Sequence, residues 1–242
     1  MSCRRKNAMA TTAARTVSIV GLGRLGLCQA LVFEAAGWDV LGCDVHPSYV
    51  ASINEKTLRS SEPEVETMLQ NTSRLRATLS LEETLAFSDL VLVLVATPTG
   101  IGEHSYDCGS LSKVLDDIAA QKPRNKHVVV CCTVQPGYLE RVGALLLAEC
   151  EGCTLSYNPE FIAQGRILAG LREPEMVLIG EGSIAAGDAL QELYESCTSS
   201  QPTICRMSVA SAELTKLALN WCAQCSQLPA CAHLGHARPS LY

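Results

Sequence analysis

The stretch T-V-S-I-V-G-L-G-R-L-G, residues 16–26, determines the fold class of this 242-residue chain. It joins a short apolar strand to the start of a helical pattern, and Gly21, Gly23 and Gly26 give it the spacing G-x-G-x-x-G. Gly21 permits a tight turn, Gly23 lets a pyrophosphate approach the backbone, and Gly26 allows the helix to pack closely on the strand. This context predicts a dinucleotide-binding turn, although three glycines in a turn also have a purely structural interpretation.

Two neighbouring features specify the nucleotide. Arg24 and Leu25 open the helix, whose free N–H groups and positive dipole end suit phosphates. Asp44 follows the next apolar strand, 18 residues after the last glycine of the turn. A carboxylate there accepts hydrogen bonds from an adenosine ribose 2′-hydroxyl and repels a 2′-phosphate, which predicts NAD rather than NADP as the cofactor. The alternative is that Asp44 caps a helix that starts near Pro47.

Outward from this turn, short apolar runs alternate with amphipathic stretches of helical length. The expected strands are residues 17–20, 39–43, 77–80, 90–96, 127–133, 154–157, 176–179 and 203–205, and the clearest expected helices are 24–36, 111–121, 138–149 and 184–196. Such alternation is typical of crossover units. It predicts an α/β fold with a Rossmann-type, doubly wound parallel sheet, followed by the start of a central helix.

The pattern divides the chain into four parts. They are a basic leader (residues 1–15), an NAD-binding Rossmann domain (16–207), the start of a central linker helix (208–226) and a tail without periodicity (227–242). The leader carries four basic residues and no acid, so we expect it to be disordered; organelle targeting is the alternative interpretation. Ser208 is the expected N-cap of the helix, and Pro229 lies beyond its end.

The composition excludes several classes of protein. With 48% hydrophobic residues and a net charge of −6, the chain is neither disordered nor a good match for nucleic acid. No apolar run approaches the roughly 20 residues that a membrane span needs. The thirteen cysteines follow no secretory signal, so we expect reduced thiols in a cytoplasmic protein.

Four further segments follow the glycine turn in order. They are V-A-T-P-T (residues 95–99), C-T-V-Q-P-G (132–137), N-P-E-F-I-A-Q-G (158–165) and A-E-L-T-K-L-A-L-N (212–220). Together with the turn they resemble the UDP-glucose/GDP-mannose dehydrogenase family, which oxidises the C6 alcohol of a nucleotide sugar to a carboxylate. The resemblance covers the family's N-terminal NAD domain and the start of the helix after it. It implies an NAD-dependent enzyme with a UDP- or GDP-sugar substrate, and a homodimer.

Two threonines end apolar strands of the expected sheet. Thr97 and Thr133 lie where open parallel sheets bind ligands, at the carboxyl edge. The resemblance implies that both contact NAD. The alternative is that the Thr-Pro and Pro-Gly sequences around them simply form turns that end the strands.

The resemblance also assigns residues to the substrate. The residues implied to line the sugar and nucleotide site are Asn158, Pro159, Glu160, Phe161 and Gln164. Glu160 is a candidate general base for a water-dependent step, although an acid in the first turn of a helix is the alternative. Gln164 stands where many members carry a second carboxylate, and an amide cannot act as a base.

Lys216 and Asn220 are four residues apart and therefore share one face of the expected last helix. In the family the matching residues contact the sugar, and the lysine stabilises the oxyanion that develops at C6. The resemblance thus implies Glu160, Lys216 and Asn220 as the catalytic residues. The alternative for Lys216 is a surface ion pair with Glu213, which would contribute little.

The family's second oxidation uses a nucleophilic cysteine in a G-F-G-G-x-C-x-P-K-D-like segment well downstream of this helix. The 242 residues contain no such segment. We therefore expect this chain alone not to complete the uronic acid at a useful rate, and a non-catalytic NAD-binding fragment or regulatory module remains an alternative. A weaker alternative is a hydroxyacid or hydroxyacyl-CoA dehydrogenase, because the N-P-E-F motif gives it no support.

A metal site is not expected. The final residues offer five soft ligands, Cys222, Cys225, Cys231, His233 and His236. Their spacing matches no standard structural zinc finger.

Overall fold

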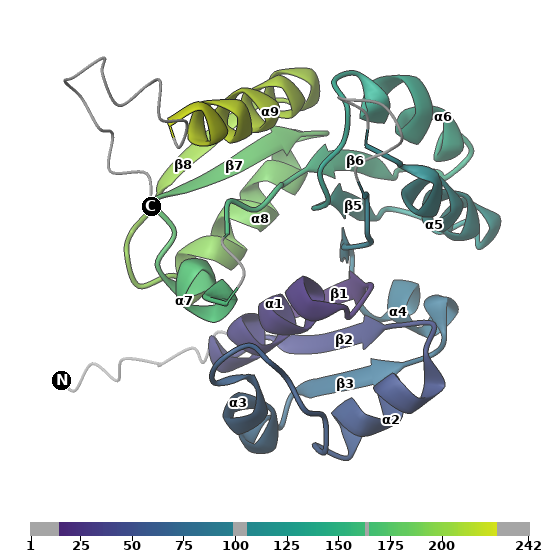
Figure 1. The fold of residues 1–242 in the computed structure, drawn as a ribbon. Coiled ribbons are helices and arrows are strands. Elements are labelled where there is room, and N and C mark those ends of the chain that lie inside the picture. Colours follow the sequence, from purple (N-terminus) through teal and green to yellow (C-terminus); the bar gives the residue numbers. More distant parts are fainter. Residues whose placement is uncertain (1–14, 99–105, 163–164, 227–242) are drawn as a thin grey trace, which may run out of the picture.

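The computed structural model describes residues 15–98, 106–162 and 165–226 (Figure 1). Within these ranges, eight strands form one sheet in the order β3-β2-β1-β4-β5-β6-β7-β8. The strands are β1 (Thr16–Val20), β2 (Asp39–Cys43), β3 (Leu75–Thr78), β4 (Leu90–Val93), β5 (His127–Val130), β6 (Thr154–Tyr157), β7 (Met176–Glu181) and β8 (Thr203–Ser208). The first six are parallel, and their order is that of a doubly wound Rossmann sheet, as predicted.

Helices cover both faces of the sheet. They are α1 (Arg24–Ala35), α2 (Pro47–Asn54), α3 (Val65–Asn71), α4 (Leu81–Phe87), α5 (Gly109–Ala120), α6 (Ala144–Leu146), α7 (Ile167–Arg172), α8 (Ile184–Cys197) and α9 (Val209–Ser226). Alternate residues of the central strands enter two separate apolar cores, as Leu92 and Val93 of β4 do. This two-sided burial explains why β4 and β5 are continuously apolar.

The direction of β7 differs from the predicted parallel sheet. It pairs with β6 in antiparallel fashion, through Tyr157 and Gly180, and β8 then runs parallel to β7. The connection from β6 to β7 contains α7 and returns the chain to the sheet at its carboxyl edge, so β7 runs the other way.

Several expected elements have different bounds. The strands expected over 90–96 and 127–133 end at Val93 and Val130. The segments that contain Thr97 and Thr133 are therefore loops at the carboxyl edge of the sheet. The helix expected over 138–149 is instead a π-helical turn, η1 (Leu139–Gly143), followed by α6. The N-cap of α9 is confirmed, since the Ser208 hydroxyl accepts a hydrogen bond from Ser211 N–H at 3.2 Å.

The two expected chain ends lie almost entirely outside the described residues, apart from Arg15. Within the described ranges, no helix is long and apolar enough to cross a membrane. The cysteines described there are all free, and no group of three potential ligands that could hold a metal is found among the same residues. The side chains of four of the five ligands of the doubtful zinc site, all but Cys222, fall outside the described part.

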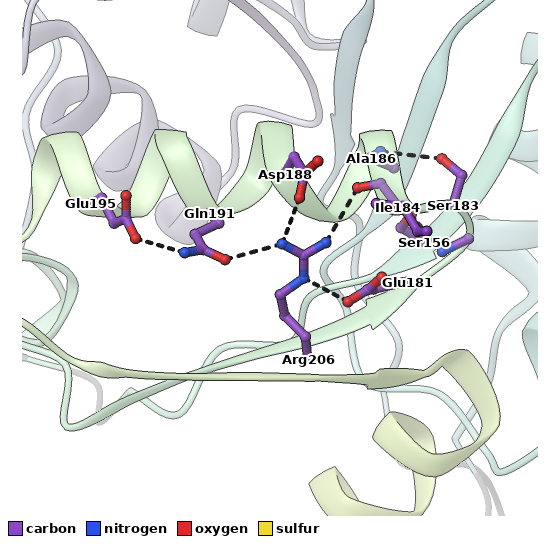
Figure 2. Close-up of polar contacts among 10 residues, drawn as sticks. Ser156, Glu181, Ser183, Ile184, Ala186, Asp188, Gln191, Glu195 and Arg206 are labelled. Atoms are coloured by element: carbon purple, nitrogen blue, oxygen red, sulfur yellow. Dashed lines mark hydrogen bonds and ion pairs between the residues drawn. The ribbon is translucent and has the colours of Figure 1, made fainter.

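One charged residue fastens the reversed strands to the helix that covers them (Figure 2). Arg206 of β8 donates from Nε to Glu181 at 2.6 Å and from Nη1 to Asp188 at 2.6 Å. The same guanidinium reaches Gln191 at 3.1 Å and the carbonyl of Ile184 at 3.3 Å. The end of β7, the middle of β8 and the first turns of α8 are therefore held by a single side chain.

Replacing Arg206 by Met should lower the free energy of unfolding by about 1–2 kcal/mol, because several charge-assisted hydrogen bonds are lost from a side chain that is only 25% exposed. Arg76, whose side chain is 58% exposed in its ion pair with Glu83, supplies the matched control. Its replacement by Met should cost about 0–1 kcal/mol. Urea unfolding measures both, and equal losses would contradict a fastening role for Arg206.

Candidate cofactor and substrate site

The glycine turn between β1 and α1 is built by close backbone contacts. Gly21 has φ +98°, and a Cβ there would lie 2.1 Å from the Leu94 carbonyl oxygen. A Cβ at Gly26 would lie 2.0 Å from the carbonyl oxygen of Gly21. A Cβ at Gly23, by contrast, would meet no described atom within 4 Å. Two glycines are therefore required by packing, while the third leaves open space in which a pyrophosphate fits.

Asp44 lies directly after β2 and faces this turn. Its carboxylate accepts hydrogen bonds from Leu22 N–H at 3.2 Å and from His46 N–H at 3.1 Å. The N-cap of α2 is His46, so the alternative of Asp44 as a helix cap is wrong. Each carboxylate oxygen can accept more than one hydrogen bond, so lone pairs remain for a ribose hydroxyl.

Two hollows flank the start of α1. One, of about 370 Å³, is lined by Gly23, Arg24 and Asp44 among others. The other, of about 480 Å³, extends from Arg24 and Leu25 to Glu160. A dinucleotide laid across the helix N-terminus would thus have room on both sides, with the adenosine end beside Asp44. The residues present fit such a cofactor.

Thr97 and Thr133 both lie at the carboxyl edge. Each is partly buried, Thr97 four residues after β4 and Thr133 three residues after β5. The first of these segments passes beside the glycine turn, where Leu94 N–H donates to the Val20 carbonyl at 2.8 Å. The topology therefore brings both threonines to the edge where the glycine turn lies.

The segment after β6 begins with a side chain that the fold itself uses. Asn158 is 1% exposed, and its amide donates to the Leu178 carbonyl at 2.9 Å. Its Oδ1 atom lies 2.7 Å from the Tyr194 hydroxyl. The Asn158 side chain therefore bonds N-P-E-F to β7 and α8 and turns away from the hollow. Pro159 is buried beside it, and Gln164 falls outside the described residues.

Glu160 is held by side chains from two helices. Its Oε1 atom accepts from Gln29 Nε2 of α1 at 2.5 Å and lies 2.6 Å from the Tyr194 hydroxyl. Burial raises the pKa of Glu160, although these hydrogen bonds and the Lys216 charge act in the opposite direction. The Tyr194 hydroxyl has one proton for two oxygen neighbours, Asn158 Oδ1 and Glu160 Oε1, so a proton on Glu160 would supply the missing hydrogen bond.

Lys216 reaches the same segment from α9. It is 5% exposed, and its Nζ donates to the Glu160 carbonyl at 2.6 Å and lies 4.2 Å from the centre of the Phe161 ring. Burial lowers the pKa of Lys216 to about 8, against the opposing effect of the Glu160 charge. An amine with that pKa is partly neutral near physiological pH, so it can both hold and release a proton. Asn220, one turn further along α9, is half-buried.

Glu213 does not pair with Lys216. It is fully buried, and its carboxylate accepts from the backbone N–H groups of Gly137 at 2.5 Å and Leu139 at 2.9 Å. The surface ion pair considered as the alternative for Lys216 is therefore wrong. Glu213 instead attaches α9 to the loop that follows Thr133.

Gln29 and Tyr194 are site residues that the motifs did not indicate. Gln29 is fully buried on α1, and its Oε1 atom has no described hydrogen-bond partner. Tyr194 is 2% exposed on α8, and burial next to Glu160 raises its pKa well above the usual value. The available signal in the sequence was the polar Gln29 between the apolar residues Cys28 and Ala30 of an expected helix. A polar side chain in such a position is usually buried with a hydrogen-bond partner.

The fold and the glycine turn together define the class of protein: a dinucleotide-binding Rossmann domain. Comparison with known proteins identifies the family. The sequence profile of the UDP-glucose/GDP-mannose dehydrogenase family, NAD binding domain, matches residues 15–198. The chain therefore belongs to this family, and its domain is an NAD-binding domain.

Similar proteins agree with this assignment. GDP-mannose 6-dehydrogenase of Pseudomonas savastanoi pv. phaseolicola is 32% identical over 216 residues, which cover 84% of this chain and 48% of that protein. UDP-glucose 6-dehydrogenase of Pseudomonas aeruginosa is 30% identical over 211 residues, 84% of this chain and 46% of the relative. A crystal structure of GDP-mannose dehydrogenase from Pseudomonas aeruginosa has a TM-score of 0.78 at 31% identity, over 86% of this chain and 50% of the other. The chain spans about half the length of these relatives.

The glycines of the turn should respond differently to the same substitution. Gly26→Ala should lower the free energy of unfolding by about 2 kcal/mol or more, because the new Cβ meets the Gly21 carbonyl. Gly23→Ala should cost less than about 1 kcal/mol, since its Cβ meets open space. It should nevertheless weaken NAD binding by about tenfold or more, by obstructing the pyrophosphate. Calorimetry and urea unfolding measure the two effects, and a Gly23→Ala variant with native affinity would contradict the proposed path of the cofactor.

The shifted pKa values of Lys216 and Glu160 predict opposite pH dependences of stability. A lowered Lys216 pKa means that the unfolded chain binds more protons, so stability should rise as the pH increases from about 8 towards 10.5. The raised Glu160 pKa means that the folded chain holds the proton longer, so stability should fall as the pH increases from 4.5 through the raised value. Urea titrations across this range should show the first slope disappear in Lys216→Met and the second in Glu160→Gln.

The exposed Lys113 is the control for this experiment. Its partner Asp117 raises its pKa, so Lys113→Met should remove a slope of the opposite sign to that of Lys216. Identical pH profiles for Lys216→Met and the native chain would show that the Lys216 amine is not buried in solution.

Proposed function

We propose that this chain is the cofactor-binding half of an NAD-dependent nucleotide-sugar 6-dehydrogenase and that it carries part of the catalytic machinery. The observation that carries the proposal is the position of the Lys216 amine, buried against Glu160 and Phe161 of N-P-E-F, the segment that borders the second hollow. Relatives named GDP-mannose 6-dehydrogenase and UDP-glucose 6-dehydrogenase support a UDP- or GDP-sugar as the substrate.

In this proposal the chain's residues divide the work. NAD held at the glycine turn beside Asp44 would supply the hydride acceptor for oxidation of the sugar's C6 alcohol. Lys216 sits next to the reacting oxygen, takes up the alcohol proton in its neutral form and stabilises negative charge on that oxygen in its protonated form. Asn220 lies on the same face of α9 and bonds the sugar. In this arrangement a preorganised amine, shielded from water, stabilises the charge that develops in the transition state.

Glu160 has a separate role in the proposed reaction. Its raised pKa makes it suited to accept a proton from a water molecule in the later, hydrolytic step, and Gln29 and Tyr194 hold it in place.

We further propose a cytoplasmic location, supported by the free cysteines of the described residues. We also propose dimers formed through α9, on which the apolar Leu214 and Trp221 are exposed. The proposed domain limits, 16–207 and 208–226, are supported by the start of α9 at Val209 with Ser208 as its N-cap.

A non-catalytic NAD-binding module is the second candidate. It is supported by the length of the chain, which covers about half of each relative above, so a substrate cleft built from the described residues alone has few walls. In that case the chain would bind NAD but would not turn over a sugar.

Adding a nucleotide sugar distinguishes the two candidates. The purified chain with NAD should form NADH slowly when UDP-glucose or GDP-mannose is added, with at most one NADH per sugar and no uronic acid. Lys216→Met should abolish this signal while calorimetry shows unchanged NAD affinity. NAD should also bind more tightly than NADP, because Asp44 repels a 2′-phosphate.

Each other outcome changes a specific part of the proposal. NAD binding without any sugar-dependent NADH would favour the non-catalytic module. A Lys216→Met variant that retains turnover would remove Lys216 from the reaction. Equal or tighter binding of NADP would contradict the role of Asp44.

A further inference from the structure

The turn between α6 and β6 contains two cysteines that the sequence motifs did not single out. Cys150-Glu151-Gly152-Cys153 closes with a hydrogen bond from Cys153 N–H to the Cys150 carbonyl at 3.1 Å. Gly152 has φ +69°, and a Cβ there would lie 2.1 Å from Asn125 Oδ1. A turn of this kind holds its first and last Cα atoms within about 7 Å. That separation is compatible with a disulfide.

The two thiols of this turn lie near each other. Burial, followed by the proximity of Cys153, raises the pKa of Cys150. Cys150 is 6% exposed, whereas Cys153 is partly exposed and its thiol donates to the Pro123 carbonyl at 3.4 Å. The pair therefore has one accessible thiol and one sheltered thiol.

Neighbouring residues hold the turn in shape. Asn125 N–H donates to the Glu151 carbonyl at 2.9 Å, and Arg124 forms an ion pair with the Glu151 carboxylate. The turn precedes the first residue of β6, Thr154, so it lies at the amino edge of the sheet, opposite the glycine turn. A reaction at these cysteines would therefore leave the cofactor site intact.

The adjacent cysteines directly after β5, Cys131 and Cys132, provide a contrast within the same chain. Cys131 belongs to the apolar core on the α1 side of the sheet, whereas Cys132 packs against the core on the other side. Neighbouring residues that point to opposite faces cannot form an ordinary disulfide. The Cys150–Cys153 turn thus has the geometry that this pair lacks.

We propose that Cys150 and Cys153 are a dithiol modification site, which a small-molecule disulfide such as glutathione disulfide converts into an intramolecular disulfide. The Cys153 thiolate attacks one sulfur of the oxidant, and one glutathione leaves as its thiolate. Cys150 then gives its proton to solvent and attacks Cys153 Sγ, which expels the second glutathione. One S–S bond forms in the protein, one is broken in the oxidant, and two glutathione thiols take up the electrons and protons.

Trypsin makes this site easy to follow. Cleavage after Arg141 and Arg166 gives one peptide, residues 142–166, with Cys150 and Cys153 as its two cysteines. The folded chain is incubated with glutathione and glutathione disulfide at graded ratios, quenched in acid, blocked with N-ethylmaleimide and digested. The peptide should become two hydrogens lighter, without added maleimide or glutathione. Cys150→Ser should stop at a glutathione adduct on Cys153, and Cys153→Ser should show no ring closure.

The Cys131 and Cys132 pair and the unfolded chain serve as controls. The tryptic peptide 127–141, with Cys131 and Cys132, should keep its dithiol mass over the same range. Ring closure at Cys150 and Cys153 should persist in the folded chain to a reducing ratio about tenfold higher than in urea, because the fold holds the thiols together. The proposal is overturned if closure occurs at the same ratio in urea, or if the folded peptide 142–166 carries separate adducts at both cysteines.

Discussion

The close packing of backbone against backbone at the glycine turn controls the rest of the site. Gly21 lies against the Leu94 carbonyl and Gly26 against the carbonyl of Gly21, so α1 starts at one position and in one direction. Two turns along the same helix, Gln29 reaches Glu160. The contacts that create an opening for a pyrophosphate at Gly23 thereby also set where the Glu160 carboxyl lies. The candidate cofactor site and the proposed substrate site therefore share α1 as a common element.

The reversed strand β7 supports the two other helices that approach Glu160. Helices α8 and α9 pack on its two opposite faces, next to the N-P-E-F segment. Tyr194 approaches Glu160 from α8 and Lys216 approaches from α9. The close approach of α9 depends on Gly180, where a Cβ would lie 2.9 Å from that of Ala212.

The sequence predicts the features that depend on local spacing. The glycine turn, Asp44, the two-sided burial of β4 and the N-cap at Ser208 all follow from residues close together in the chain. It does not predict the direction of β7, because the apolar pattern of a strand buried on both faces is the same in either direction.

Contacts between distant residues were also beyond the reach of the motifs. Gln29 and Glu160 are 131 positions apart, and Glu213 and Gly137 are 76 apart. The motif N-P-E-F indicates a candidate site segment. Only the packing shows that the Asn158 amide bonds β7 and Tyr194, while Glu160 borders the hollow. Family resemblance thus locates the site better than it assigns each side chain.

The two ionisable groups at the centre of the site are both shifted towards their neutral forms. Burial raises the pKa of Glu160 and lowers that of Lys216, and the attraction between the opposite charges does not fully compensate in either case. The Lys216 amine bonds the backbone carbonyl of Glu160 and not its carboxylate. The pair is therefore not locked as a salt bridge, and each group keeps a proton-transfer capacity of its own. The proposed reaction moves one proton from an alcohol and another from water at different stages. It needs this separation, because a closed ion pair would neutralise both groups at once.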